Sequence, residues 1–270
     1  MPASTTHFRD RVELAIEGHV AHVRLNRPDK LNALDPAMFA ALADAAAAVR
    51  GMAAVRSVVL SGNGNAFCAG LDLAAMAQLG GAGAKSLVER THGNCNHVQH
   101  AAMVWRDLPV PVICAIQGVC FGGGLQLASG ADIRFVAPDA RMAVMEVRWG
   151  LVPDIGGNVL WREQVRHDLL RELIYTHREF TGAEAVQYGF ATHLADDPLA
   201  SALAMAPEIA SKSPDAIRAA KALCNNWHDA GEDELLLAES RAQQQLIGSA
   251  NQREAVKAGL EKRAARFVDP

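Results

Sequence analysis

Apolar and polar residues alternate over residues 12–17 and again over residues 20–25, with Gly18 and His19 between the two runs. A period of two is typical of half-buried strands, and a glycine between two such runs predicts a β-hairpin. Residues 37–49 follow a helical period, and Asp35 and Pro36 supply an N-cap and a first-turn proline. The apolar run at 57–60 is typical of a strand buried on both faces.

The order strand, glycine-containing turn, helix recurs along residues 57–176. After the run at 57–60 it returns as a strand at 110–116, a turn at 118–124 and an apolar helical turn at 125–131. It returns again as apolar segments at 133–136 and 143–145, a turn at 150–154 and a helix at 158–176. This recurring order predicts an α/β fold in which successive strand-turn-helix units form the turns of a spiral. The sequence shows no strict repeat.

The last part of the chain differs from the rest because only helical periodicity is found there. From Pro198 onward the pattern includes predicted helices at 235–246 and 251–266. We therefore divide the chain into a core over residues 1–197 and a helical C-terminal region over residues 198–270. A region without strands of its own is expected to pack against the core or against a neighbouring subunit.

Length and composition are those of an ordinary globular protein. Of the 270 residues, 50% are hydrophobic and 21% are charged, so the chain can bury a large core. The 26 Lys and Arg against 30 Asp and Glu give a formal net charge of -4, which provides no broad positive field for nucleic acid or an acidic membrane. With 5% aromatic residues, a base-stacking groove is also disfavoured. A polyanionic ligand would need local basic clusters.

Cysteine usage and the N-terminal sequence predict a cytoplasmic protein. The five cysteines include no C-x-x-C pair, so we expect reduced thiols in a reducing compartment. The N-terminus carries charges where a secretion signal needs an apolar core. The longest apolar stretch, residues 108–121, contains two prolines and is too short to span a bilayer.

Two glycine-containing turns, at 68–72 and 121–124, each follow a predicted strand and precede a predicted helix. Main-chain N–H groups at such a point are unpaired and can bind an oxygen that becomes negative. Two convergent amides would form an oxyanion hole, in which one donor contributes roughly 3 to 4 kcal/mol to the transition state. Glycines in series are equally common as packing devices, so neither turn alone identifies a site.

Ordered motifs carry a resemblance to a known family, and the similarity runs along nearly the whole chain, from Asn26-Arg27-Pro28 to Glu261-Lys262-Arg263. The motifs are SGxGxAFCAGxDL at 61–73, AIxGxxxGGGxxLA at 115–128, ADIR at 131–134, GLVP at 150–153 and FTGxxAxxxG at 180–189. In these motifs the chain resembles the crotonase superfamily, which is the enoyl-CoA hydratase/isomerase family.

The resemblance implies a crotonase-like spiral of ββα turns with a helical C-terminal region, assembled as homotrimers or dimers of trimers. It implies an acyl-CoA substrate whose thioester oxygen accepts hydrogen bonds from the amides of Leu71 and Gly123. It implies no resident cofactor, because CoA enters as part of the substrate. A positioned carboxylate must then take and return the α-proton.

The available carboxylates distinguish the reactions of this family. Its hydratases have one Glu three residues after the central glycine of the triple and another Glu twenty residues later. Here Gln126 and Glu146 stand at these positions. Gln126 can orient a water or a carboxylate but cannot exchange a proton at neutral pH, which disfavours two-carboxylate hydration. The apolar neighbours of Glu146 predict a raised pKa, and a surface acid on a strand is the alternative interpretation.

A second acid, Asp154, lies eight residues after Glu146. The dienoyl-CoA isomerases of the family have an acid at this spacing and also an Asp where Gln126 stands, so two of their three acids match. Asp154 could instead be the N-cap of the following helix. The pattern favours double-bond isomerisation in an enoyl- or dienoyl-CoA. Hydration by Glu146 alone, acyl-CoA hydrolysis, and a non-catalytic CoA-ester or RNA-binding protein are the alternatives.

The resemblance also implies residues that border CoA. Two segments would meet its adenosine end, and a C-terminal basic pair would approach its phosphates. Lys30 could equally be a solvated loop charge. These residues are Lys30, Leu31, Ala33, Ala69, Gly70 and Asp72 for the adenosine end, with Lys262 and Arg263 for the phosphates.

Possible metal ligands cluster in one segment, at His92, Cys95, His97 and His100. Their spacing fits no standard zinc pattern. A polar helix over the acyl pocket explains them more simply, and we expect no bound metal.

Overall fold

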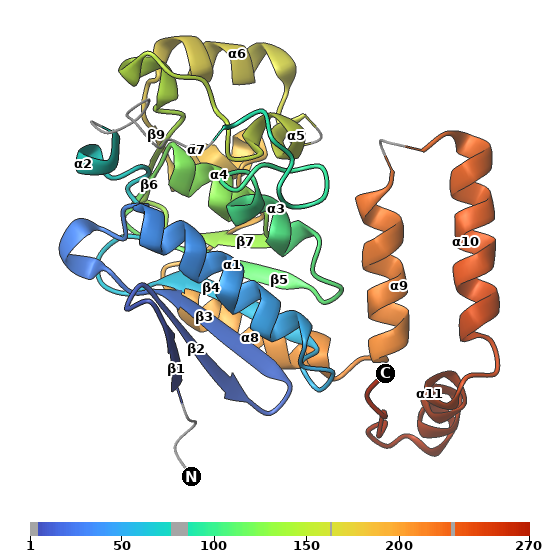
Figure 1. Cartoon of the computed structure of the whole chain (residues 1–270). Coiled ribbons are helices and arrows are strands. Elements are labelled where there is room, and N and C mark those ends of the chain that lie inside the picture. The colour runs from blue at the N-terminus through green and yellow to red at the C-terminus, as the bar shows by residue number, and fades with distance from the viewer. Residues whose placement is uncertain (1–4, 77–85, 163, 228–229) are drawn as a thin grey trace.

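The computed structural model describes residues 5–76, 86–162, 164–227 and 230–270 (Figure 1). A seven-stranded sheet lies at its centre. Its first three strands are antiparallel and include the predicted hairpin, while the following strands are parallel. In order across the sheet they are β1 (Thr5–Phe8), β2 (Val12–Glu17), β3 (Val20–Leu25), β4 (Ser57–Gly62), β5 (Val112–Ile116), β7 (Ile133–Val136) and β10 (His193–Leu194).

A second, three-stranded sheet consists of β6 (Val119–Phe121), β8 (Arg141–Ala143) and β9 (Phe180–Thr181), in the order β6-β8-β9. Only two residues, Gln117 and Gly118, separate the end of β5 from the start of β6, so the chain passes directly from one sheet to the other. Strand β8 pairs with β6 in parallel and with β9 in antiparallel orientation. The alternation of strands and helices confirms the predicted α/β fold.

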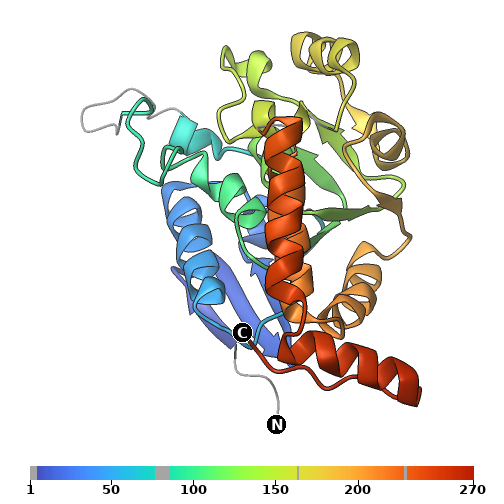
Figure 2. The same ribbon diagram turned by 90° about the vertical axis from the view of Figure 1, so that its right-hand side faces the viewer.

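Helices cover both faces of the large sheet (Figures 1 and 2). The described helices are α1 (Pro36–Arg50), α2 (Leu73–Met76), α3 (His100–Arg106), α4 (Gly123–Ser129), α5 (Gly157–Trp161), α6 (His167–Thr176), α7 (Gly182–Tyr188), α8 (Pro198–Ala210), α9 (Pro214–Asn225), α10 (Glu232–Leu246) and α11 (Ala250–Glu261), with two 3₁₀ turns, η1 (Pro28–Lys30) and η2 (Glu146–Trp149). Helices α9 and α10 lie beside the two sheets, and α11 lies below them in Figure 1.

The hydrophobic core has two parts, one on each face of the large sheet. The larger part includes the fully buried Phe67, Trp105 and Trp161 and joins α1, α3, α4 and α5 to the sheet. The smaller part lies under α8, whose Ala202 and Ala206 pack against apolar residues of the parallel strands. Every residue of β4 is buried, as expected for a parallel strand covered on both faces.

Two predicted helices have different bounds in the structure. The single helix expected over 158–176 is two helices, α5 and α6. Leu160 and Trp161 of α5 are buried in the core, whereas α6 lies at the surface and buries only Leu170 and Leu173. Both helices are amphipathic, so the hydrophobic period continues across the break and does not reveal it. The helix expected over 251–266 ends at Glu261.

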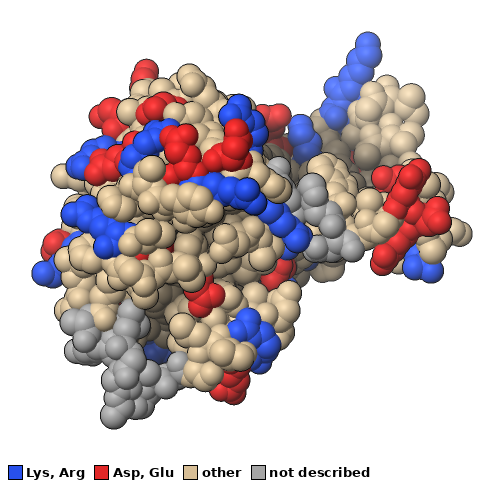
Figure 3. All heavy atoms as spheres, turned by 90° about the horizontal axis from the view of Figure 1, so that it is seen from above, with Lys and Arg blue, Asp and Glu red and all other residues tan. Residues whose placement is uncertain are grey.

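Charged side chains of both signs are interspersed on the face seen from above (Figure 3). Around α6 several of them form exposed ion pairs, such as Arg166 with Asp168 and Arg178 with Glu172. Such pairs contribute little to stability. In the described part of the chain, no helix combines the length and apolar character needed to cross a membrane.

Helix α9 is attached to the core by a buried lysine. The Nζ of Lys221 donates to the carbonyl oxygens of Trp105 and Val110 at 3.1 and 2.9 Å and to Asp132 Oδ2 at 2.7 Å. The Lys221 side chain is only 5% exposed, and burial lowers its pKa. These three acceptors compensate the loss of hydration, so α9 is held at the end of β5 by polar contacts.

We predict that Lys221→Met lowers the free energy of unfolding by about 3 kcal/mol, because Asp132 and two carbonyl groups lose their shared donor. Urea denaturation followed by circular dichroism measures the change. The matched control is Lys212→Met, at an exposed position, where we expect a change within about 0.5 kcal/mol. Equal effects of the two substitutions would contradict this role of Lys221.

Candidate active site

The two glycine-containing turns of the sequence lie against each other in the structure. Cys68 and Cys120 pair as a parallel bridge, and the Phe121 N–H donates to the Cys68 carbonyl at 3.0 Å. A Cβ on Gly124 would lie 2.4 Å from the same carbonyl oxygen. Only a residue without a side chain can be this close to a main chain. The close approach brings residues 68–72 and 121–124 together, as the oxyanion-hole prediction requires.

The main-chain N–H groups of Leu71 and Gly123 are the two donors that the oxyanion-hole prediction requires. Neither N–H donates to a protein acceptor within the part of the chain that the structure describes. A Cβ on Gly70 would have the Phe121 carbonyl oxygen at 2.8 Å and the Gly123 nitrogen at 3.6 Å, so the two turns meet at these atoms. An oxygen atom that accepted from both amides would be stabilised as its negative charge grew.

Residues 31–34 hold the first turn in place. The Leu34 N–H donates to the Gly70 carbonyl at 2.8 Å, and the Asp72 N–H donates to the Leu34 carbonyl at 3.0 Å. The Ala69 N–H donates to the Leu31 carbonyl at 2.9 Å. These bonds engage the N–H groups of Ala69 and Asp72 and leave the Leu71 N–H facing away from residues 31–34.

Glu146 lies beside the second turn. Strand β8 ends at Ala143, and Glu146 begins η2, so the alternative interpretation of Glu146 as a surface acid on a strand was wrong. A Cβ on Gly122 would be 3.3 Å from Glu146 Oε1. Glu146 Oε1 accepts from Gln126 Nε2 at 2.5 Å, whereas Oε2 is buried and has no hydrogen-bond partner among the described residues. Burial raises the pKa of this carboxyl, which suits a group that must take and return a proton.

Gln126 is buried on α4 and connects Glu146 to the segment that follows Asp154. Its Oε1 accepts from the N–H groups of Ile155 and Gly157 at 2.8 and 3.0 Å. Because two N–H donors fix this oxygen, the amide nitrogen must face Glu146. Both ends of the Gln126 carboxamide are therefore hydrogen-bonded to other groups of the chain.

Asp154 is not the N-cap of α5, so that alternative was wrong. The N-cap is Gly156, which has a φ of 88°. The Asp154 carboxylate instead accepts from Gln99 Nε2 at 2.5 Å and from Asn96 Nδ2 at 3.2 Å. Sequence analysis missed both partners, which lie more than fifty residues earlier. The sequence indicated these partners only in that Asn96 and Gln99 lie within the histidine-rich segment, residues 92–100.

The residues expected at the adenosine end of CoA lie close to the first turn. Lys30 and Leu31 are exposed, and Ala33 is buried. Asp72, however, has both oxygens engaged: Oδ1 caps α2, and Oδ2 accepts from Arg27 Nη1 at 2.7 Å. Sequence analysis missed Arg27, although it belongs to the Asn-Arg-Pro segment that begins the matched motifs. The Arg27–Asp72 pair joins the two segments that border the first turn.

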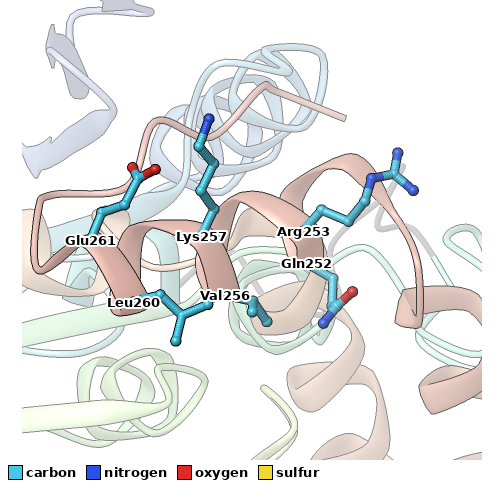
Figure 4. A pocket seen from close by; sticks show the side chains of 6 residues that line it. All are labelled: Gln252, Arg253, Val256, Lys257, Leu260 and Glu261. Atoms are coloured by element: carbon cyan, nitrogen blue, oxygen red, sulfur yellow. The ribbon is translucent and has the colours of Figure 1, made fainter.

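The basic pair Lys262 and Arg263 follows α11, apart from both turns in this chain (Figure 1). Arg263 forms ion pairs with Glu254 and Glu261 at 2.6 Å. A shallow hollow of about 310 Å³ runs along the same helix, and Figure 4 shows the side chains that line it. This hollow is made by α11 alone and contains none of the candidate catalytic residues; it is lined by Gln252, Arg253, Val256, Lys257, Leu260 and Glu261.

The histidine-rich segment forms a ring stack. The His92 and His100 rings stack with centroids 4.1 Å apart. Burial lowers the pKa of His100 to about 4. Over the residues described by the structure, no group of three or more His, Cys, Asp and Glu side chains could hold a metal ion.

The sequence and the fold match one family. The family model described as enoyl-CoA hydratase/isomerase matches residues 15–270. The chain is 32% identical over 258 residues to the mitochondrial Delta(3,5)-Delta(2,4)-dienoyl-CoA isomerase of Mus musculus, covering 93% of this chain and 79% of that protein. It is 30% identical to enoyl-CoA hydratase EchA19 of Mycobacterium tuberculosis, covering 93% of each chain.

Solved structures agree with the sequence matches. The crystal structure of an enoyl-CoA hydratase from Bacillus anthracis superposes with a TM-score of 0.86 at 29% identity, covering 95% of this chain and 98% of that chain. The crotonase-like fold predicted from the motifs is thereby confirmed.

We predict that Gly124→Ala lowers turnover of an acyl-CoA substrate at least about tenfold, because the added Cβ must push the Cys68 carbonyl and its turn away from Gly123. Steady-state kinetics, with folding checked by circular dichroism, measure the loss. Gly51→Ala is the control, because its Cβ would have no neighbour closer than 3.5 Å. Full activity of Gly124→Ala would mean that the spacing of the turns is unimportant.

The raised pKa of Glu146 predicts the pH dependence. As pH falls, a carboxyl with a raised pKa binds a proton earlier than an ordinary glutamate, so kcat/KM should decline at a pH above 4.5. The Gln126 hydrogen bond lowers this pKa, so Gln126→Met should move the decline to higher pH. The exposed Gln187→Met should leave it unchanged. A decline that Gln126→Met does not move would refute the assignment to Glu146.

Proposed function

Because the chain belongs to the enoyl-CoA hydratase/isomerase family, we propose that it moves a carbon–carbon double bond within an enoyl- or dienoyl-CoA thioester. The observation that carries this proposal is the pair of acids joined through Gln126. Glu146 binds its Nε2, and Asp154 directly precedes Ile155, whose N–H binds its Oε1. The position where the family's hydratases have a second Glu holds a group that cannot exchange a proton.

The reaction begins at the thioester carbonyl. Its oxygen accepts hydrogen bonds from the Leu71 and Gly123 amides, which makes the proton on C2 more acidic. A carboxylate removes that proton, and the electrons of the C–H bond delocalise into an enolate or dienolate whose oxygen the two amides stabilise. A carboxyl group then protonates a more distant carbon, so the double bond moves and no atom is gained or lost.

Glu146 and Asp154 are the proton carriers in this scheme. Glu146 has one oxygen free of protein partners in a buried site, and its raised pKa allows it to hold a proton and to release it. Asp154 directly precedes Ile155, whose N–H binds the oxygen of the Gln126 carboxamide. Two carboxyl groups at separate points along the acyl chain suit a proton transfer between separate carbons.

Hydration is less well supported because of the environment of Gln126. A two-carboxylate hydratase must hold a water and remove its proton. The Gln126 carbonyl oxygen already accepts from two main-chain amides, and its nitrogen donates to Glu146. Of the two positions that carry Glu in the family's hydratases, 126 and 146, only Glu146 is therefore an acid here.

The CoA part of the substrate would lie along the exposed Lys30 and Leu31, near Ala33, Ala69 and Gly70. Lys262 and Arg263 lie apart from these residues in one chain (Figure 1). We propose that they reach the CoA phosphates of a neighbouring subunit in a homotrimer or a dimer of trimers. Asp72, whose carboxylate oxygens accept from α2 and from Arg27, also supports the first turn.

Hydration of a 2-enoyl-CoA is the second candidate. Similar proteins named enoyl-CoA hydratase, from M. tuberculosis and B. anthracis, favour it. In this case the unpartnered Glu146 Oε2 would activate the water without a second carboxylate.

A substrate panel separates the two candidates. We predict that 3-enoyl- or 3,5-dienoyl-CoA is isomerised faster than 2-enoyl-CoA is hydrated, as followed by ultraviolet absorbance and by deuterium uptake from ²H₂O. Glu146→Gln should lower kcat by about 10² to 10⁴-fold and still bind the thioester, because only proton transfer is lost.

The control for Glu146→Gln is Glu208→Gln, an exposed glutamate on α8. It should retain full activity. Efficient hydration of 2-enoyl-CoA with no movement of the double bond would overturn the isomerase proposal in favour of the hydratase.

A further inference from the structure

The Asp154 carboxylate lies between two carboxamides that precede α3. Gln99 Nε2 binds one carboxylate oxygen at 2.5 Å, and Asn96 Nδ2 binds the other at 3.2 Å. We infer that Asn96 and Gln99 are positioning residues, which fix the direction of the Asp154 carboxylate and thereby the point on the acyl chain that it reaches. This inference rests on the proposed function and extends it to residues that do not touch the reacting atoms.

The orientation of the Asn96 carboxamide is fixed by its own main-chain contacts. Its Oδ1 accepts from the N–H groups of Val98 and Gln99 at 3.0 and 2.8 Å. The amide nitrogen must therefore face the other way, where it donates to the Leu87 carbonyl and to Asp154. Asn96 is fully buried, so its side chain has no alternative partner in water.

The Gln99 carboxamide is oriented in the same manner. Its Oε1 accepts from the Asn96 N–H at 3.1 Å and from Arg90 Nη1 at 3.0 Å. An oxygen that accepts from two N–H donors cannot exchange places with the nitrogen. The Nε2 group thus faces Asp154, and both carboxamides present N–H groups to the carboxylate.

Asp154 needs such support because its own backbone lies in a loop between η2 and α5. The loop is fixed on one side of Asp154 where Ile155 binds Gln126. Gln99 directly precedes α3, whose residues 101–105 are all buried in the core. The two carboxamides therefore connect Asp154 to a rigid helix, which is the condition for precise placement of a proton-transfer group.

A double-mutant cycle tests the inference. We expect Gln99→Met, which keeps the side-chain size but removes the donor, to lower kcat for isomerisation about tenfold with KM changed less than about twofold. Asp154→Asn alone should lower kcat by about a hundredfold or more. In the Asp154→Asn background, Gln99→Met should change kcat less than about twofold, because the carboxylate on which it acts is absent.

A second variant, Gln99→Glu, distinguishes loss of the hydrogen bond to Asp154 from a loss of kcat caused by damage to the local structure. Gln99→Glu keeps an oxygen for the Asn96 N–H and Arg90 but replaces the donor with an acceptor, so kcat should fall at least as far as in Gln99→Met. The exposed Gln187→Met on α7 is the matched control and should retain wild-type kcat.

Two results would overturn the inference while the proposed function stands. One is a wild-type kcat in both Gln99 variants. The other is an equal fall of kcat for Gln99→Met with and without the Asp154 carboxylate, which shows a structural role only. A wild-type protein that moves no double bond would instead refute the proposed function, and this inference with it.

Discussion

The close approach of two main-chain turns is the constraint on which the rest of the site depends. The Cys68 carbonyl lies so near Gly124 that no side chain fits between them, and the amides of Leu71 and Gly123 are brought together as a result. The contact is possible because β5 leads directly into β6, which pairs with β8 and delivers the second turn to the first. Backbone geometry, set by the sheets, thus determines where an oxygen could be bound.

Around this contact, several polar side chains satisfy one another. Gln126 binds the Ile155 and Gly157 amides and Glu146, and Asp154 accepts from Asn96 and Gln99. Within the described part of the chain, Glu146 Oε2 has no hydrogen-bond partner. An unsatisfied buried oxygen is costly for folding, and such costs are typical of groups that function requires.

Most of the fold, and the two turns, could be predicted from the sequence because their signals are local. Period-two alternation locates the hairpin, and glycines at fixed spacing locate the turns. The break between α5 and α6 could not be predicted, because both helices continue the same period across it. The hydrogen bonds of Asp154 were equally inaccessible, since their donors, Asn96 and Gln99, lie more than fifty residues earlier. An Asp before a helix resembles an N-cap until the tertiary structure shows that Gly156 occupies that place.

The hydrogen bonds of Gln126 also determine what an exchange of glutamine for glutamate at this position would change. The codons of glutamine and glutamate differ by a single nucleotide, so one base change would place a second carboxyl opposite Glu146. The amides of Ile155 and Gly157 that now bind the Gln126 oxygen would bind a carboxylate oxygen equally well. These main-chain contacts would therefore survive the exchange, but the Gln126 donor to Glu146 would become an acceptor, so the two carboxyl groups would have to share a proton or hold a water between them.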